Sequence, residues 1–267
     1  MNIQAGDRHP LFDKIAEIAG IIFEHGWAEA FGGNISVRLT DVERDELIGE
    51  FPFLLPTGRL EEKHAIPDLA GLSVLIKASG ARMRQLRRRP EPYLLLMEFG
   101  DNGVEYVLRA SEPGERKPSS EYLTHLAVQA AKRGDLERRF ILHAHTTGLN
   151  KLGHLETDYK RFSRLLRDTS PETAELIPEG VAFIDYIRPG TIDLARATAD
   201  SLKRKRLAVW RCHGSVAVGP DLDSCLDLLE IADNAAEMCA DLWGKRDSWQ
   251  SPWNPKDKGS GGPVGFF

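Results

Sequence analysis

Two histidines, His143 and His145, stand two positions apart at the end of a short apolar run. The run, Phe140-Ile141-Leu142, follows Arg138-Arg139 and precedes Thr146-Thr147-Gly148, a pattern typical of a strand. Side chains two positions apart on a strand point to the same face of the sheet. The two imidazoles could therefore hold one divalent metal ion, although two unrelated surface histidines would give the same pattern.

A third histidine, His213, lies where a predicted strand meets a glycine turn, in Trp210-Arg211-Cys212-His213-Gly214. Three protein ligands with one open position are typical of a catalytic zinc ion. We therefore predict that His143, His145 and His213 bind zinc, and Gly214 would let the backbone approach a bound group closely. The alternative is that His213 is a hydrogen-bonded strand terminus. Cys212 is another possible zinc ligand, although its place on the strand does not require it to face the site.

Small polar segments could bind an anion. Ser119, Ser120 and Glu121 follow Pro118 at a predicted helix start, where hydroxyls and free backbone N–H groups could bind phosphate. Gly32-Gly33-Asn34 and Ser79-Gly80 are two further segments whose N–H groups could surround an anion. The alternatives are an ordinary helix cap, with Ser120 as the N-cap, and two glycine turns.

The elements that must position these residues alternate along the chain. Apolar spacing predicts helices at 11 to about 26, 121–133, 157–168, 191–205 and 222–243, and strands at 35–39, 72–77, 93–99, 104–108, 139–145, 181–187, 207–212 and 216–218. Asp101-Asn102-Gly103 predicts a hairpin turn, Thr191 a helix N-cap, and residues 41–68 a loop-rich excursion.

This order of elements predicts one α/β domain, residues 1–246, whose mixed, largely antiparallel central sheet is flanked by helices. Residues 247–267 are rich in Gly, Pro, Ser and Trp, and we expect them to form an extended tail.

Composition narrows the class of protein. The chain has 267 residues and a net charge of −5, which argues against nucleic acid as a partner. Its three cysteines include no CxxC pair, so we expect a reducing, cytoplasmic location rather than a disulfide framework. The sequence lacks a run of about 20 apolar residues of the kind that a membrane helix needs. We therefore expect no membrane partner.

Taken together, the motifs resemble those of the class II aldolase and adducin family, in the family's order, from about residue 11 to residue 244. The matching segments are Gly32-Gly33-Asn34-Ile35-Ser36, Ala78-Ser79-Gly80, Ser119-Ser120-Glu121, His143-Ala144-His145 and Arg211-Cys212-His213-Gly214. Within the family, three features are most similar to the branch that acts on rhamnulose phosphate: Gly26-Trp27, the long segment between Asn34 and Ser79, and the pair Pro178-Glu179-Gly180-Val181 and Arg188-Pro189-Gly190-Thr191.

The resemblance implies a fold, an activity and residue roles. It implies a homotetrameric lyase that cleaves a phosphorylated ketose, with one zinc ion per subunit held by His143, His145 and His213. Glu121 would be the catalytic acid and base, and Glu172 a second catalytic carboxylate. The implied phosphate-binding residues are Gly33, Asn34, Ser79, Gly80, Ser119 and Ser120.

Two positions depart from the branch. Phe31 replaces an asparagine, and Ala78 replaces the first glycine of a Gly-Ser-Gly loop, which reduces backbone freedom there. Both lie at the donor end of the implied pocket, so they leave the exact ketose phosphate open. An aldolase or 4-epimerase of the fuculose- or ribulose-phosphate type, a non-catalytic adducin-like binding module and a zinc hydrolase are the alternatives.

Overall fold

The computed structural model describes residues 8–61, 64 and 66–245, so the predicted tail at 247–267 lies outside the described residues. Within the described residues, the strands form one nine-stranded sheet in the order β2-β5-β4-β3-β1-β6-β9-β8-β7. The pairings along this order are antiparallel except that of β7 with β8. The strands are β1 (Asn34–Leu39), β2 (Phe53–Arg59), β3 (Ser73–Lys77), β4 (Leu94–Phe99), β5 (Glu105–Ala110), β6 (Phe140–Ala144), β7 (Ala182–Ile184), β8 (Leu207–Trp210) and β9 (Gly214–Gly219).

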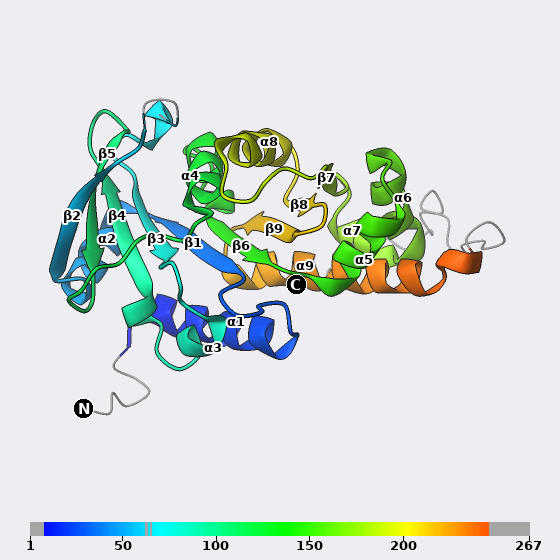
Figure 1. Ribbon diagram of the computed structural model, residues 1–267, viewed down its shortest axis with the longest axis horizontal. Coiled ribbons are helices and arrows are strands. Elements are labelled where there is room, and N and C mark those ends of the chain that lie inside the picture. The colour runs from blue at the N-terminus through cyan, green and yellow to red at the C-terminus, as the bar shows by residue number, and fades with distance from the viewer. Residues whose placement is uncertain (1–7, 62–63, 65, 246–267) are drawn as a thin grey trace, which may run out of the picture.

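Helices cover both faces of the central strands (Figure 1). They are α1 (Pro10–Glu24), α2 (Asp41–Leu47), α3 (Met83–Leu86), α4 (Tyr122–Ala131), α5 (Thr147–Leu155), α6 (Tyr159–Thr169), α7 (Pro171–Leu176), α8 (Ile192–Leu202) and α9 (Leu222–Asp241). In Figure 1, α4 and α8 lie on one side of β6 and β9, and α1, α3 and α9 lie on the other. The predicted fold class is confirmed.

The centre of the sheet positions the histidines. β6 is buried along its whole length and pairs with β1 on one side and β9 on the other. Because both faces are covered by helices, its first three residues, Phe140-Ile141-Leu142, form a continuous apolar run rather than an alternating one. The register sets Asn34 and Val216 opposite His143. Residues from three strands therefore meet at one end of β6.

The prediction for residues 41–68 is wrong. Helix α2 begins there with a capping box between Thr40 and Glu43, and β2 pairs with β5 as an edge strand. Most of β2 is exposed and it contains Pro56, so it lacks the apolar alternation of an inner strand. The sequence pattern also does not predict α3, α5 and α7, each of which has at most nine residues.

Two local predictions are confirmed. The turn around Asp101-Asn102-Gly103 joins the antiparallel strands β4 and β5, and Gly103 has a φ of +65°. The Thr191 hydroxyl accepts a hydrogen bond from the Leu194 N–H at 3.4 Å, as an N-cap does. Among the described residues, no helix has the length and apolarity needed to cross a membrane.

A buried carboxyl group at Asp233 makes stability depend on pH. Asp233 lies on α9, and its Oδ1 accepts a hydrogen bond of 2.8 Å from the Leu149 N–H in the first turn of α5. Burial raises its pKa from 3.8 to about 6. Between these two values the folded chain binds more protons than the unfolded chain, so this group lowers stability as the pH rises.

We expect Asp233→Asn to remove this loss while keeping an oxygen that accepts the Leu149 N–H. Relative to the wild type, the free energy of unfolding of the variant should rise by about 2 kcal/mol between pH 4 and pH 7. Urea unfolding of both proteins at the two pH values measures the difference. If the free energies of unfolding of the variant and the wild type differ by the same amount at pH 4 and at pH 7, Asp233 is not the group responsible.

Candidate metal centre and active site

Three imidazoles come together at the end of β6. His143 is the fourth residue of this strand, His145 directly follows its end, and His213 lies in the turn between β8 and β9. One ligand atom from each ring lies within 4.8 Å of those of the other two. The ring centroids are 5.3, 5.0 and 5.2 Å apart. The structure thus brings the predicted histidines together.

Neighbouring groups fix how two of these rings are turned. The Nδ1–H of His143 donates to the Ser215 carbonyl oxygen at 2.8 Å, which leaves Nε2 as the free nitrogen. His145 Nδ1 donates to Glu29 Oε2, also at 2.8 Å. Such partners orient metal-binding histidines and select their tautomer. The Trp210 ring packs against His143 and His213, with centroids 4.5 and 5.1 Å away.

The polar atoms of the cluster fit a divalent cation. Within the described part of the chain, His143 Nε2, His213 Nδ1 and Glu121 Oε1 are buried without a hydrogen-bond partner. Burial lowers the pKa of His143 well below its usual value and that of His213 to about 4, so both rings are neutral at pH 7. Neutral imidazole is the form that binds a metal ion, and buried polar atoms are seldom left unpaired.

Glu121 lies against two of the imidazoles. Its Oε2 is 3.3 Å from His143 Nε2, and its Oε1 is 3.2 Å from His213 Nε2. The residue is only 5% exposed, and burial raises its pKa to about 7. A carboxyl group with a pKa near the working pH can both give and take a proton.

The start of α4 directs this carboxylate inward. Glu121 itself occupies the N-cap position and makes no side-chain cap hydrogen bond, so the alternative in which Ser120 caps the helix is wrong. Instead, Asn34 Nδ2 donates to Glu121 Oε2 at 2.6 Å. The Ser119 hydroxyl donates in turn to Asn34 Oδ1, also at 2.6 Å. A chain of two hydrogen bonds therefore holds the carboxylate beside the histidines.

The predicted phosphate-binding segments lie side by side. Ala78 and Pro118 form a small antiparallel bridge, in which the Ser79 N–H donates to the Lys117 carbonyl and the Ser119 N–H to the Lys77 carbonyl. Ser79, Gly80 and Ser120 are exposed beyond this bridge, whereas Ser119 is buried. Gly80 and Gly33 have φ values of +74° and +75°, which favour glycine.

Sequence reasoning missed Lys77. This residue ends the buried strand β3 and is only 1% exposed. Its Nζ donates to the carbonyl oxygens of Phe31 at 2.9 Å and Ala81 at 2.7 Å, so it ties together the loops that precede β1 and follow β3. Burial lowers its pKa to about 8, and the Glu121 charge partly opposes that shift. The sequence did offer one indication of this buried role, because Lys77 stands at the end of an otherwise apolar strand.

Two other candidates lie away from the cluster. Glu172 is exposed in the first turn of α7, where its carboxylate accepts a hydrogen bond from the Ser170 hydroxyl at 2.8 Å. Within the described residues, no contact joins Glu172 to Glu121 or to the three histidines. Cys212 is also exposed, and its sulfur faces His154 Nδ1 at 3.8 Å instead of joining the group of ligand atoms.

Phe31 and Ala78, the two residues that depart from the family pattern, differ in their exposure. Phe31 is 52% exposed, and the Arg82 guanidinium lies 4.2 Å from its ring centre. Ala78 is buried in the bridge to Pro118. Phe31 therefore presents an apolar ring at the surface, while Ala78 stiffens the loop before Ser79.

Gly32 leaves the room that the His145 ring occupies. A Cβ atom at position 32 would lie 2.8 Å from His145 Cε1 and 2.9 Å from Nδ1, closer than such atoms approach. We expect Gly32→Ala to displace this ring and to weaken metal binding by about 10-fold or more. Gly134→Ala is the matched control because no atom lies within 4 Å of its added methyl group. Metal titration of both variants measures the effect, and equal affinities would contradict it.

Comparison with known proteins decides the family. The family model described as the Class II Aldolase and Adducin N-terminal domain matches residues 13–240. The chain belongs to this family. The match covers the sheet from β1 to β9, and with it Glu121 and the three histidines.

Curated relatives of this class II aldolase family member share about the same span. A rhamnulose-1-phosphate aldolase of Enterococcus faecalis is 31% identical over 86% of this chain and 82% of its own length. A rhamnulose-1-phosphate aldolase of Pectobacterium atrosepticum is 30% identical over 80% of this chain and 78% of its own length. These similarities support the lyase class and a phosphorylated sugar as the substrate.

Solved structures share the fold of this class II aldolase family member. A sugar-phosphate aldolase from Thermotoga maritima has a TM-score of 0.75 and 27% identity, over 88% of this chain and 95% of its own. An L-fuculose-1-phosphate aldolase from Thermus thermophilus has a TM-score of 0.58 and 18% identity, over 91% of this chain and 99% of its own. Because class II aldolases are metal-dependent, the group of three histidines is the candidate metal centre of this chain.

Proposed function

We propose that this chain is a zinc-dependent aldolase that reversibly cleaves L-rhamnulose 1-phosphate to dihydroxyacetone phosphate and L-lactaldehyde. The observation that carries the proposal is the place of Glu121, a buried carboxyl group within 3.3 Å of His143 and 3.2 Å of His213. The similarity to rhamnulose-1-phosphate aldolases over more than three quarters of the chain supports the choice of substrate.

The residues have separate roles in this proposal. His143, His145 and His213 would hold zinc, which supplies a Lewis acid for the negative charge that develops on the ketose oxygens as the bond breaks. Asn34, Ser119 and Ser120, with Ser79 and the backbone of Gly33 and Gly80, would hold the phosphate. Lys77 lies behind these loops and fixes them through the carbonyl groups that it contacts.

Glu121 would move the proton at carbon 3. When the bond between carbons 3 and 4 breaks, the hydroxyl on carbon 4 passes its proton to a water molecule and becomes the aldehyde. Carbon 3 gains a proton, which the neutral Glu121 carboxyl group supplies, and water returns a proton to the resulting carboxylate. In the reverse direction its carboxylate removes the same proton from dihydroxyacetone phosphate. Burial raises the pKa of this carboxyl group, which favours the neutral form that donates the proton.

Aldehyde release from a panel of ketose phosphates, together with metal content, tests this function. We expect one bound zinc ion per chain and the fastest cleavage with L-rhamnulose 1-phosphate. Faster cleavage of L-fuculose 1-phosphate, or epimerisation of a ribulose phosphate, would replace the substrate but keep the chemistry. Failure to bind any divalent metal would favour an adducin-like binding module.

The proposal also includes the homotetrameric state that the family resemblance implies and the cytoplasmic location expected from the cysteine content. Analytical ultracentrifugation tests the first of these, and a monomer at micromolar concentration would contradict it. Glu172 is left out of the proposed mechanism because its carboxylate faces the Ser170 hydroxyl on an exposed helix.

A further inference from the structure

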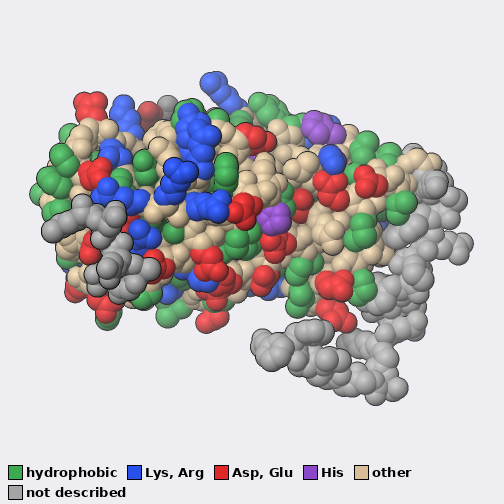
Figure 2. Space-filling model, turned by 90° about the horizontal axis from the view of Figure 1, so that it is seen from below, with side chains coloured by type: hydrophobic (Ala, Val, Ile, Leu, Met, Phe, Trp, Pro, Cys, Tyr) green, Lys and Arg blue, Asp and Glu red, His purple; other side chains and the backbone are tan. Residues whose placement is uncertain are grey.

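An arginine-lined cavity opens on the face formed by α1 and α3, away from the histidine cluster. Its volume is about 890 Å³. This size is within the range of small-molecule sites. Basic side chains gather near the middle of this face (Figure 2). Its lining includes Phe23, Arg84, Arg87, Arg88, Arg89 and Tyr93.

The cavity has an excess of positive charge. Four guanidinium groups line it against one carboxylate, that of Glu112. Arg87 pairs with Glu24 at 2.8 Å and Arg89 pairs with Glu112 at 3.1 Å. Among the described residues, no carboxylate pairs with Arg84 or Arg88. Because the chain as a whole carries a net charge of −5, this local excess indicates an anionic ligand.

The shape of the basic groups favours phosphate groups. A guanidinium ion presents a planar set of N–H donors that matches the oxygens of phosphate or carboxylate in pairs. Arg84, Arg87 and Arg88 come from α3 and from the turn directly after it, so they lie within five positions of one another. Several arginines on one short segment can bind more than one phosphate group of the same molecule.

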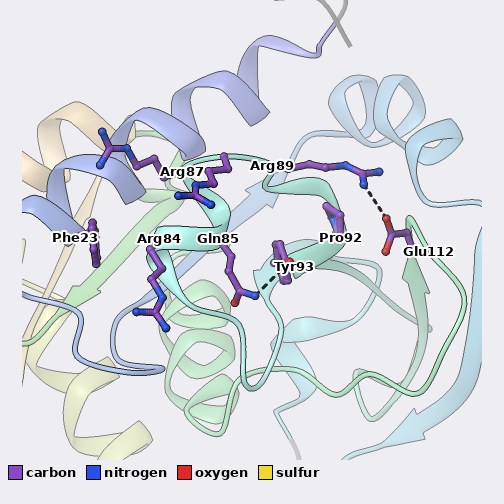
Figure 3. Close-up of a pocket in the computed structure, with 9 residues that line it drawn as sticks. Phe23, Arg84, Gln85, Arg87, Arg89, Pro92, Tyr93 and Glu112 are labelled. Atoms are coloured by element: carbon purple, nitrogen blue, oxygen red, sulfur yellow. Dashed lines mark hydrogen bonds and ion pairs between the residues drawn. The ribbon is translucent and has the colours of Figure 1, made fainter. Parts of the chain in front are cut away.

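Aromatic rings complete the cavity. Phe23 is 39% exposed at the end of α1, and the Tyr93 hydroxyl accepts a hydrogen bond from Gln85 Nε2 at 3.3 Å. Figure 3 shows Arg84 and Arg87 between Phe23 and Tyr93. An exposed ring beside guanidinium groups is suited to a flat heterocycle, because both kinds of surface stack on a nucleobase.

We propose that this cavity binds a nucleoside polyphosphate, with the phosphates on Arg84 and Arg88 and the base against Phe23. The site is separate from the candidate metal centre, since none of its lining residues belongs to the proposed catalytic or phosphate-binding set. Gln85 and Tyr93 also line a second hollow that contains Ser79 and Gly80. A ligand in the arginine-lined cavity would therefore lie directly next to one of the proposed phosphate-binding loops.

Isothermal titration calorimetry of the full chain with ATP tests the proposal. We expect saturable binding that weakens at least 10-fold in the double variant Arg84→Ala/Arg88→Ala. Phe23→Ala should weaken it about 5-fold or more, because stacking of a base on a ring contributes about 1–3 kcal/mol. Inorganic triphosphate should bind the wild type more weakly than ATP does.

The matched control is Arg164→Ala/Arg204→Ala, which removes the same charge from two exposed residues outside the cavity. It should bind ATP as the wild type does, and all variants should keep the thermal unfolding midpoint of the wild type. An equal loss of ATP affinity in the control variant, or no saturable ATP binding by the wild type, would overturn the proposed site. Triphosphate that binds as tightly as ATP would overturn the nucleoside part. A changed sedimentation coefficient in the Arg84/Arg88 variant would assign the arginines to subunit contacts and also overturn the proposal.

Discussion

We expect the replacement of Glu121 with glutamine to lower the rate of the proposed L-rhamnulose 1-phosphate cleavage by about 10²–10⁴-fold, the usual contribution of a general acid or base. Glutamine has the same shape and can still accept the hydrogen bond from Asn34. It cannot give or take a proton, so we expect kcat to fall with little change in KM. Steady-state kinetics with the metal content of each preparation measured in parallel gives the result.

Glu172→Gln is the matched control for this experiment. It makes the same chemical change at an exposed carboxylate whose described partner is the Ser170 hydroxyl. We expect cleavage at the wild-type rate. A Glu121 variant within about threefold of the wild type would remove Glu121 from the chemistry. An equally large loss in both variants would restore the second catalytic carboxylate that the family resemblance implies.

The second large effect is on metal binding. We expect His145→Ala to lower metal affinity by more than about 100-fold, since it removes one of the three proposed ligands and not merely a neighbour of one. Cleavage should fall with the metal content. The His145 side chain is partly exposed, so the variant should still fold. Elemental analysis after dialysis against a weak chelator measures the metal per chain.

His154→Ala is the control for His145→Ala. His154 is exposed, and its ring nitrogen faces the Cys212 sulfur rather than the three-histidine group. The His154→Ala variant should keep the wild-type metal content and activity. Wild-type protein stripped by a strong chelator should resemble the His145 variant and recover when zinc is added. Full metal content in His145→Ala would exclude this residue as a ligand.

The sequence was sufficient to predict that the three histidines would meet at the candidate centre. His143 and His145 share a strand end, and the glycine after His213 marks the next turn, so their chemistry was visible in short segments. The register that sets Asn34 opposite His143 was not visible, because strand pairing joins residues 109 positions apart. The hydrogen bond from Asn34 to Glu121 depends on that register.

Other parts of the structure escaped prediction for physical reasons. β2 forms because β5 offers its open edge, and not because its own residues alternate. Lys77 resembles a surface residue in sequence, yet inside the molecule two backbone carbonyl groups accept hydrogen bonds from its Nζ. The spacing of Glu172 from His145 does not fix which way its carboxyl group points, and α7 carries it to the surface.

The pairing of β6 with β9 has a consequence for the order in which the molecule matures. His143 and His213 come from segments 70 positions apart, and they meet only after β9 has added to the sheet. A growing chain that has not yet reached residue 213 holds just two of the three imidazoles. Tight metal uptake would therefore report that β9 has joined β6, and a bound ion would favour chains that have reached this stage over earlier intermediates.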